Sequence, residues 1–173
     1  MDSRMLLAEL PRLRRYARAL IGERAAADDL VQDTLERAWA RFDQWRTGSE
    51  MRPWLFSIMH NLRVDQLRKP SVSLVDIDDE VQAVPTRPTQ DDQIELADLA
   101  AAIGRLPEEQ RAVLLLVGLE EMSYADVAAT LNIPLGTVMS RLARGRERLR
   151  VLLAAQAGNP STTPSHPSLR VVR

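Results

Sequence analysis

Arginines recur at helical spacing in residues 123–150. Arg141, Arg144 and Arg148 are separated by three and four residues, and Thr137 precedes Arg141 by four. At about 100° per residue, this spacing places the four side chains on one face of a helix. A guanidinium can donate two parallel hydrogen bonds to O6 and N7 of guanine, or it can pair with phosphates. The spacing therefore predicts a helix that reads the major groove of DNA, against the alternative of a solvated basic face.

The residues around this stripe predict a helix-turn-helix. Ser123, followed by Asp126 three residues later, is typical of a helix N-cap. Residues 132–134 interrupt the first helix, and the fixed φ of Pro134 suits the opening of a second. That second helix also carries an apolar row that can anchor it on a small core: Val138, Leu142, Gly145 and Leu149. The cap, the turn and the stripe together favour DNA binding over a solvated face.

The composition predicts a nearly all-helical protein. The 173 residues are 45% hydrophobic but only 4% aromatic, and few segments alternate like strands. The absence of cysteine excludes disulfides, thiolate zinc sites and cysteine nucleophiles. No apolar run approaches the ~20 residues that cross a bilayer, and the N-terminus lacks the apolar block of a signal peptide. We therefore expect a cytoplasmic protein without membrane insertion.

Charge is strongly segregated along the chain, although the formal net charge is only −1. Residues 52–69 and residues 123–150 each carry a net charge of +3, whereas residues 71–99 carry −7. Two basic surfaces joined by an acidic connector suggest two contacts with nucleic acid. On composition alone, an acidic linker that is merely solvated is an equal alternative.

Helical periodicity divides the chain into two small all-α domains. Apolar residues recur at helical spacing in residues 3–22, 25–42 and 53–69, and again from Ile94 and after Pro107. Prolines and acids between the two groups predict a flexible linker. We therefore expect a four-part organisation: an N-terminal domain over 1–70, an acidic linker over 71–93, a helix-turn-helix domain over 94–155, and a disordered tail over 156–173.

The sequence offers little for an enzyme. It has two histidines, no phosphate-cradling glycine-rich loop and no nucleophile–base arrangement. His60 has no Asp, Glu or Cys at ligand spacing, so we expect no metal site, no cofactor and an exposed, structural His60. Trp54, beside Leu55, is interpreted as a core residue rather than a stacking platform.

Four segments in order carry a family resemblance: DDLVQDTLERAW, PWLFSIMHNLRVDQLR, LPEEQRAVLLL and SYADVA…IPLGTVMSRLARGRERLR. Together they span about residues 5–153, and their order is more specific than a single helix-turn-helix. The chain resembles the extracytoplasmic-function (ECF) sigma factors of bacterial RNA polymerase. Its opening LPRLRRYARAL and its version of the second segment are similar to the general-stress sigma factors of alphaproteobacteria.

The resemblance implies that the N-terminal domain binds the clamp helices of the polymerase β′ subunit, with the β subunit as a further contact of the protein. An acidic, amide-bearing helix face can orient on basic side chains of a partner. An ordinary solvated acidic face is the alternative. The matching helix, residues 28–42, would present Asp28, Asp29, Gln32, Asp33 and Arg37.

The helix over residues 53–69 matches the family's element for recognising and melting the minus-ten region. Strand opening needs positive charge along the single strand and a pocket for an unstacked base. Asn61 aligns with a position that lines this pocket, and residues 46–51 would form its wall. The implied minus-ten set is Asn61, Arg63, Arg68 and Lys69.

The resemblance assigns the second helix of the helix-turn-helix to the minus-thirty-five element. The backbone N–H groups near Gly136 and Thr137 could meet a phosphate at the helix start. Two departures from the family stand out: Met139 occupies a position that is often basic, and Gly145 one that is often alanine. The implied contacts with bases or phosphates are Thr137, Met139, Ser140, Arg141, Arg144 and Arg146.

The function implied is that of a sigma factor, which binds core RNA polymerase, directs it to promoter DNA and assists strand opening. The acidic linker would follow the polymerase's RNA exit path, and an anti-sigma factor would be a regulatory partner. The alternative is a conventional helix-turn-helix regulator that occupies duplex operators without polymerase.

Overall fold

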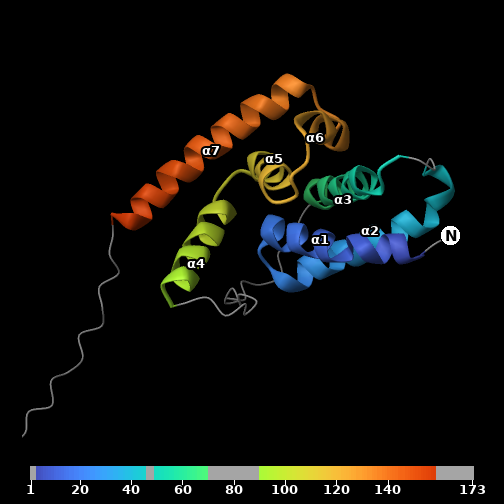
Figure 1. Ribbon diagram of the computed structural model, residues 1–173, viewed down its shortest axis with the longest axis horizontal. Coiled ribbons are helices and arrows are strands. Elements are labelled where there is room, and N and C mark those ends of the chain that lie inside the picture. Colours follow the sequence, from blue (N-terminus) through green and yellow to red (C-terminus); the bar gives the residue numbers. More distant parts are fainter. Residues whose placement is uncertain (1–2, 46–48, 70–89, 159–173) are drawn as a thin grey trace, which may run out of the picture.

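The computed structural model describes residues 3–45, 49–69 and 90–158, with side chains of the last range described from Glu95 onward. Within these ranges every element of regular secondary structure is a helix, which confirms the predicted all-α class (Figure 1). The predicted acidic linker and tail lie largely outside the described residues. The helices are α1 (Ser3–Ile21), α2 (Arg24–Ala40), the 3₁₀ turn η1 (Phe42–Gln44), α3 (Met51–Arg68), α4 (Gln90–Gly104), α5 (Glu108–Gly118), α6 (Tyr124–Leu131) and α7 (Leu135–Ala157).

The N-terminal half is a bundle of α1, α2 and α3. Helix α1 ends at Ile21 and is followed by Gly22, whose φ of +85° is readily adopted only by glycine. Glu23 then caps α2, because its carboxylate accepts hydrogen bonds from the N–H groups of Ala25 and Ala26 at 2.6 and 2.7 Å. The rings of Tyr16 and Phe56 meet edge to face with centroids 5.1 Å apart, which joins α1 to α3.

The C-terminal half contains the predicted helix-turn-helix. The Oγ of Ser123 accepts a hydrogen bond from the N–H of Asp126 at 3.1 Å, as the cap signature predicted. Asn132 ends α6 in the left-handed conformation with φ of +53°, and Pro134 is the N-cap of α7. Of the apolar row predicted on α7, Val138, Leu142 and Gly145 are buried, whereas Leu149 is only partly buried.

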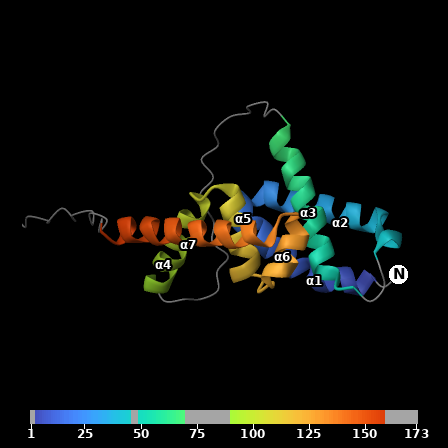
Figure 2. The same ribbon diagram turned by 90° about the horizontal axis from the view of Figure 1, so that it is seen from above.

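The two halves pack directly on each other. Helix α1 contacts α4 and α5, and α3 contacts α6. Figures 1 and 2 agree in placing α5 beside α1 and α6 beside α3. Buried residues from both halves form one contiguous hydrophobic cluster, which runs from Leu6 to Leu142. The sequence predicted two helical units and a connector, and the structure adds a contact between the units that no local pattern indicated.

Several helix ends differ from the predicted ones. Helix α4 begins at Gln90 rather than near Ile94, and α7 continues to Ala157, so the helix reaches beyond residue 155. The cause is the same in both cases, because periodicity marks only the buried part of a helix. Residues 95–101 are all exposed, and the last turns of α7 carry no buried residue. Helix α2 stops at Ala40, and Phe42 lies in η1 instead of the helix.

Candidate nucleic-acid and polymerase interfaces

The exposed face of α7 carries three of the six residues predicted to contact the minus-thirty-five element. Because Val138, Leu142 and Gly145 point into the core, residues about 180° away face solvent. Met139 is 53% exposed, and Arg144 and Arg146 are also exposed. Thr137, Ser140 and Arg141 are only partly exposed. The structure therefore divides this set into a solvent face and an edge that turns toward the rest of the protein.

The edge of α7 is held by contacts within the chain. Arg141 is 24% exposed, and its Nη2 lies 3.2 Å from the Oε2 of Glu109 on α5. The Oγ of Ser140 donates to the carbonyl of Thr137 at 3.1 Å. The N–H of Thr137 donates to the carbonyl of Pro134 at 3.0 Å, so this N–H, predicted to meet a phosphate, is already engaged. The amides before it remain at the open end of the helix, where an anion can bind.

The predicted minus-ten set does not share one face of α3. Asn61 and Arg68 are seven residues apart and lie within about 20° of each other around the helix, whereas Arg63 lies about 200° from Asn61. Asn61, Arg68 and Lys69 are exposed. Arg63 instead points at α5, where its Nε and Nη2 donate to the two carboxylate oxygens of Glu108 at 2.6 and 2.9 Å. The spacing alone could have separated Arg63 from the other three.

His60 is not exposed, contrary to the prediction. It is partly buried, and charged groups of α5 and α7 act on its imidazole. Burial lowers the pKa of the imidazole below its usual value, the guanidinium of Arg141 lowers it further, and Glu108 opposes both. The exposure of His60 was predicted because no metal-ligating residues lie near it in the sequence. That absence carries no information about which side chains pack on the imidazole. Trp54 is half-buried and packs against the core cluster, in line with its interpretation as a core residue.

The predicted polymerase-facing residues all lie on the outer half of α2. The inner half is occupied by Ala27, Leu30, Val31, Thr34 and Ala38. Asp29, Gln32 and Asp33 are exposed, while Asp28 and Arg37 flank them and are partly exposed. Asp28 pairs with Arg18 at 3.2 Å, and the amide of Gln32 donates to Glu36 at 3.0 Å. This face therefore presents acidic and amide groups to solvent.

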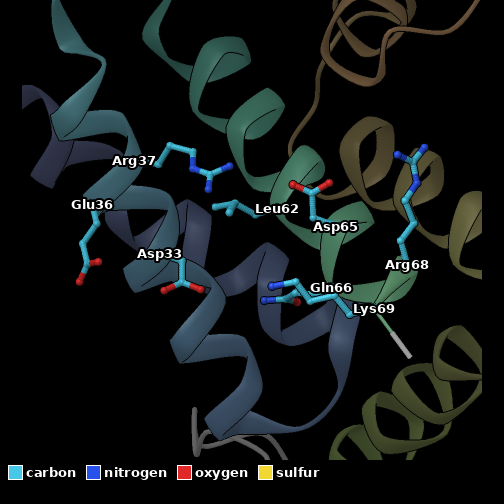
Figure 3. A pocket seen from close by; sticks show the side chains of 8 residues that line it. All are labelled: Asp33, Glu36, Arg37, Leu62, Asp65, Gln66, Arg68 and Lys69. Carbon is cyan, nitrogen blue, oxygen red and sulfur yellow. The ribbon is translucent and has the colours of Figure 1, made fainter. Parts of the chain in front are cut away.

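An open groove of about 550 Å³ runs between α2 and the C-terminal part of α3. Figure 3 shows Arg37 reaching from α2 toward α3, with Glu36 pointing away from that helix. The groove brings members of the polymerase set and the minus-ten set together with residues that sequence reasoning missed. Its lining is Asp33, Glu36, Arg37, Leu62, Asp65, Gln66, Arg68 and Lys69. Within each helix, the lining residues recur at intervals of three or four positions. This spacing is the signal in the sequence that could have identified the missed residues as members of one face.

Contacts between the halves involve ionic residues that the sequence did not single out. Glu120 is fully buried and accepts two hydrogen bonds from Arg15 of α1, at 3.1 and 2.9 Å. Arg111 of α5 donates to the carbonyl of Leu20 at 2.5 Å, to the last two carbonyls of α4 and to the carbonyl of Leu106 just after it. Burial lowers the pKa of Arg111 from its ordinary value, with Glu108 opposing the shift. Arg15 and Glu120 are 105 residues apart and Arg111 and Leu20 are 91 apart, so no local pattern could reveal these two contacts.

Among the residues that the structure describes, no group of three or more His, Cys, Asp or Glu side chains could hold a metal ion. In the same part of the chain, no helix combines the length and the apolar character needed to span a membrane.

Two family models match the chain in the order that the sequence indicated. Residues 6–60 match the Sigma2 domain of PhyR, and residues 96–149 match Sigma-70, region 4. The first match runs from within α1 to the middle of α3, and the second from within α4 to within α7. The first coincides with the bundle that carries the acidic face and the second with the helix-turn-helix.

Relatives are similar over most of the chain. The ECF RNA polymerase sigma factor EcfG of Rhodopseudomonas palustris is 40% identical over 86% of this chain and 82% of its own. SigW of Bacillus subtilis, also an ECF RNA polymerase sigma factor, is 30% identical over 76% and 77%. Among solved structures, the sigma factor RpoE of Bartonella quintana, in complex with the anti-sigma factor NepR, is 34% identical. It has a TM-score of 0.70 and covers 88% of this chain and 96% of that one.

The matches to EcfG and to the PhyR domain also fit the general-stress subtype that the sequence resembled. With both sigma domains in order and a relative that is 40% identical over most of its length, the chain belongs to the ECF sigma factors and directs RNA polymerase to specific promoters.

Proposed function

We propose that three helices of this sigma factor divide the work of initiation. The outer face of α2 docks on the clamp helices of the polymerase β′ subunit, α3 reads and opens the minus-ten element, and α7 reads the minus-thirty-five element. The domains would be residues 1–70 and 94–155, joined by the acidic segment 71–93 and followed by the tail. The observation that carries the proposal is that one chain presents an acidic face on α2 and an arginine-rich face on α7.

The α2 face suits a basic partner helix. Asp29 and Asp33 are exposed, and Gln32 and Arg37 add hydrogen-bonding groups beside them. Complementary charge across an interface raises the association rate and fixes orientation. Asp28 is shared with Arg18 and Arg24, so it would contribute less to an external partner.

Helix α3 offers a base-reading group and positive charge at one end. The exposed amide of Asn61 can donate to and accept from the edge of an unstacked base. Arg68 and Lys69 lie along the groove between α2 and α3 and can attract the backbone of a single strand. In the described arrangement Arg63 would reach DNA only after leaving Glu108.

Helix α7 places mixed groups in reach of the major groove. Arg144 and Arg146 are free to pair with phosphates or guanine, and the exposed Met139 offers an apolar contact such as a thymine methyl group accepts. Arg141 would read a base once released from Glu109. Gly136 at the helix start leaves room for a phosphate on the backbone, since nothing lies within 4 Å of a Cβ built there.

The proposal also includes an anti-sigma factor and the β subunit of the polymerase as partners. RpoE of Bartonella quintana binds the anti-sigma factor NepR, and we propose that an anti-sigma factor also binds this chain. The β subunit of the polymerase would contact the C-terminal half. The protein would act in the cytoplasm, without cofactor or catalytic activity of its own.

Retention of the purified chain on immobilised core polymerase tests the α2 assignment. The variant Asp29→Lys/Asp33→Lys should weaken retention by at least about tenfold, because two attractive contacts become repulsive. The matched control Asp98→Lys changes an exposed acid on α4 and should bind like the wild type. Equal retention of all three proteins would remove α2 from the polymerase interface. A conventional regulator would instead occupy its DNA site fully without polymerase.

A further inference from the structure

Helix α4 leaves most of an apolar row uncovered. Of its residues whose side chains are described, only Ala102 is buried, while Leu96 and Leu99 are 57% and 36% exposed. At helical spacing, these two leucines continue the row of Ile103, which packs against the hydrophobic core cluster. Such a row is stabilised when another apolar group covers it. The described residues supply only part of that cover.

An open groove of about 540 Å³ lies between this row and the last turns of α7. Figures 1 and 2 show α4 next to the C-terminal part of α7, and the two helices are in contact. Leu96 and Leu99 line the groove from α4, and Leu153 lines it from α7. Apolar side chains of both helices therefore face one groove.

Gln156, in the last turn of α7, lines the same groove and holds an unmatched acceptor. Its Oε1 is buried but accepts no hydrogen bond from the residues that the structure describes. Buried acceptors are nearly always paired, because losing water without gaining a donor is unfavourable. A segment that lies in the groove would supply this donor from a backbone N–H or a guanidinium.

Two carboxylates make the groove acidic. Glu95 and Asp98 line it and are exposed, and within the described ranges neither forms an ion pair. A matching occupant is therefore both apolar and basic. The acidic connector over residues 71–93 has the wrong charge. A second copy placed by a two-fold axis would bring the same carboxylates toward each other.

The C-terminal segment of this chain has the required chemistry. Residues 169–173 read Leu-Arg-Val-Val-Arg, so three apolar side chains and two guanidinium groups occur within five residues. Residues 159–173 contain no acidic side chain. The segment lies outside the described residues, so the argument for it depends on its sequence and on the groove.

The point from which this segment leaves α7 favours the same groove. Helix α7 ends at Ala157, which itself lines the groove. The ten residues 159–168 can span about 31 Å at the rise of a polyproline helix. The stretch of α7 from Leu153 to Ala157 is only about 6 Å long. Residues 169–173 can therefore turn back onto the groove, and a short tether makes even weak contacts sufficient.

We propose that residues 169–173 dock in the groove between α4 and α7, with their apolar side chains on the leucines and their arginines at Glu95 and Asp98. The docked segment is a strap that holds α4 against α7 and covers its apolar row. The proposal is independent of the assignments to promoter DNA and to polymerase, because no residue of those sets lines this groove.

Amide hydrogen exchange in the full-length chain tests whether the segment covers α4. The docking variants are Leu169→Ser/Val171→Ser/Val172→Ser and Arg170→Gln/Arg173→Gln. The matched control Thr162→Glu/Thr163→Glu lowers the net charge by as much as the arginine variant does, but outside residues 169–173. Exchange over residues 95–101 is compared with exchange over α2, and a thermal melt verifies that each protein is folded.

In the apolar variant, residues 95–101 should exchange about three- to tenfold faster than in the parent, because α4 loses its cover. The arginine variant should show a smaller increase that disappears at high salt. Helix α2 should be unchanged in every protein, and the control should match the parent. Equal exchange in the parent and the apolar variant would overturn the proposal and leave a partner protein as the occupant. An equal increase in the control would overturn it too, since the charge of the segment would then suffice.

A spin label tests whether docking occurs within one chain. The sequence contains no cysteine, so Ser168→Cys can carry a single nitroxide. The nitroxide should broaden the amide signals of residues 96–99, and the broadening should weaken in the apolar variant. An isotope-labelled chain mixed with a spin-labelled, isotope-free chain should show no such broadening. Broadening in the mixture would overturn the proposal in favour of a second copy as the occupant.

A charge exchange tests where the two arginines lie. Glu95→Arg/Asp98→Arg should weaken the broadening, because the groove would then repel Arg170 and Arg173. Adding Arg170→Glu/Arg173→Glu to that variant should restore it, since attractive pairs form again with their signs exchanged. Broadening that stays weak in the combined variant would overturn the proposal.

Discussion

Arg63 donates two hydrogen bonds to Glu108, 45 residues later in the chain, at 2.6 and 2.9 Å. This pair joins the helix assigned to the minus-ten element to α5, the second helix after the connector. It turns Arg63 away from Asn61, so the described chain offers DNA only part of the predicted minus-ten set. The expected consequences concern individual residues of α3 and α7, two glycines and one histidine.

Replacing Arg141 by Ala should weaken promoter binding in a sequence-dependent way, because a guanidinium on a base edge discriminates by about 1–3 kcal/mol. Arg150→Ala is the matched variant. Arg150 is exposed and pairs with Glu147 at 2.7 Å. We expect it to attract phosphates rather than to read bases, so its loss should weaken binding to all promoters alike. Binding of holoenzyme to promoters with single changes in the minus-thirty-five element provides the measurement. Equal, sequence-blind losses from both variants would exclude Arg141 from direct readout.

Asn61→Ala should impair strand opening more than the initial capture of duplex. The exposed amide is assigned to an unstacked base, which exists only after melting begins. Permanganate reactivity of thymines in the minus-ten region reports opening, and filter retention reports capture. Gln66→Ala, another exposed amide on α3, is the control. Normal permanganate reactivity in the Asn61 variant would contradict the assignment.

Gly145→Ala should stabilise the protein by about 0.5–1 kcal/mol, because alanine is the better helix former. A Cβ at this position would meet Gln110 at 3.5 Å, an ordinary van der Waals contact with α5. Gly22→Ala should act in the opposite direction, because its φ of +85° strains any residue with a Cβ. Urea denaturation of both variants provides the test. A destabilised Gly145→Ala protein would mean that α7 and α5 cannot accommodate a methyl group.

Lowering the pH from 7.5 to 5.5 should destabilise the folded chain through His60. Its pKa is lowered in the fold, chiefly by burial and then by Arg141, with Glu108 opposing. The unfolded chain therefore takes up a proton near pH 6.5 that the folded chain still rejects, and stability present above that pH falls as the pH decreases. Urea denaturation across this range measures the slope. His60→Gln should flatten it, and an unaltered slope in that variant would contradict the account.

Features set by neighbouring residues could be predicted from the sequence. The cap at Ser123, the left-handed turn at Asn132 and the buried row of α7 depend on residues within a few positions of one another. The outer face of α2 was predictable for the same reason, because the periodicity of its core residues fixes which side faces solvent.

Features set by distant residues could not be predicted. Glu120 is an ordinary acidic residue in the sequence, and only the approach of Arg15, 105 residues away, explains its burial. The environment of His60 has the same origin, since the charged groups that act on its imidazole, Glu108 and Arg141, come from α5 and α7. The side of α3 on which Arg63 lies could be predicted, because Arg63 and Asn61 are about 200° apart around the helix. Its partner Glu108 could not be predicted.

Run-off transcription with purified core polymerase tests the central claim most directly, because it requires polymerase binding, promoter recognition and strand opening at once. Core polymerase is incubated with a promoter library, with and without the full chain. We predict RNA from a subset of templates with fixed start sites, lost when Arg144→Ala/Arg146→Ala replaces the wild type. RNA no different from that of core polymerase alone would contradict the account.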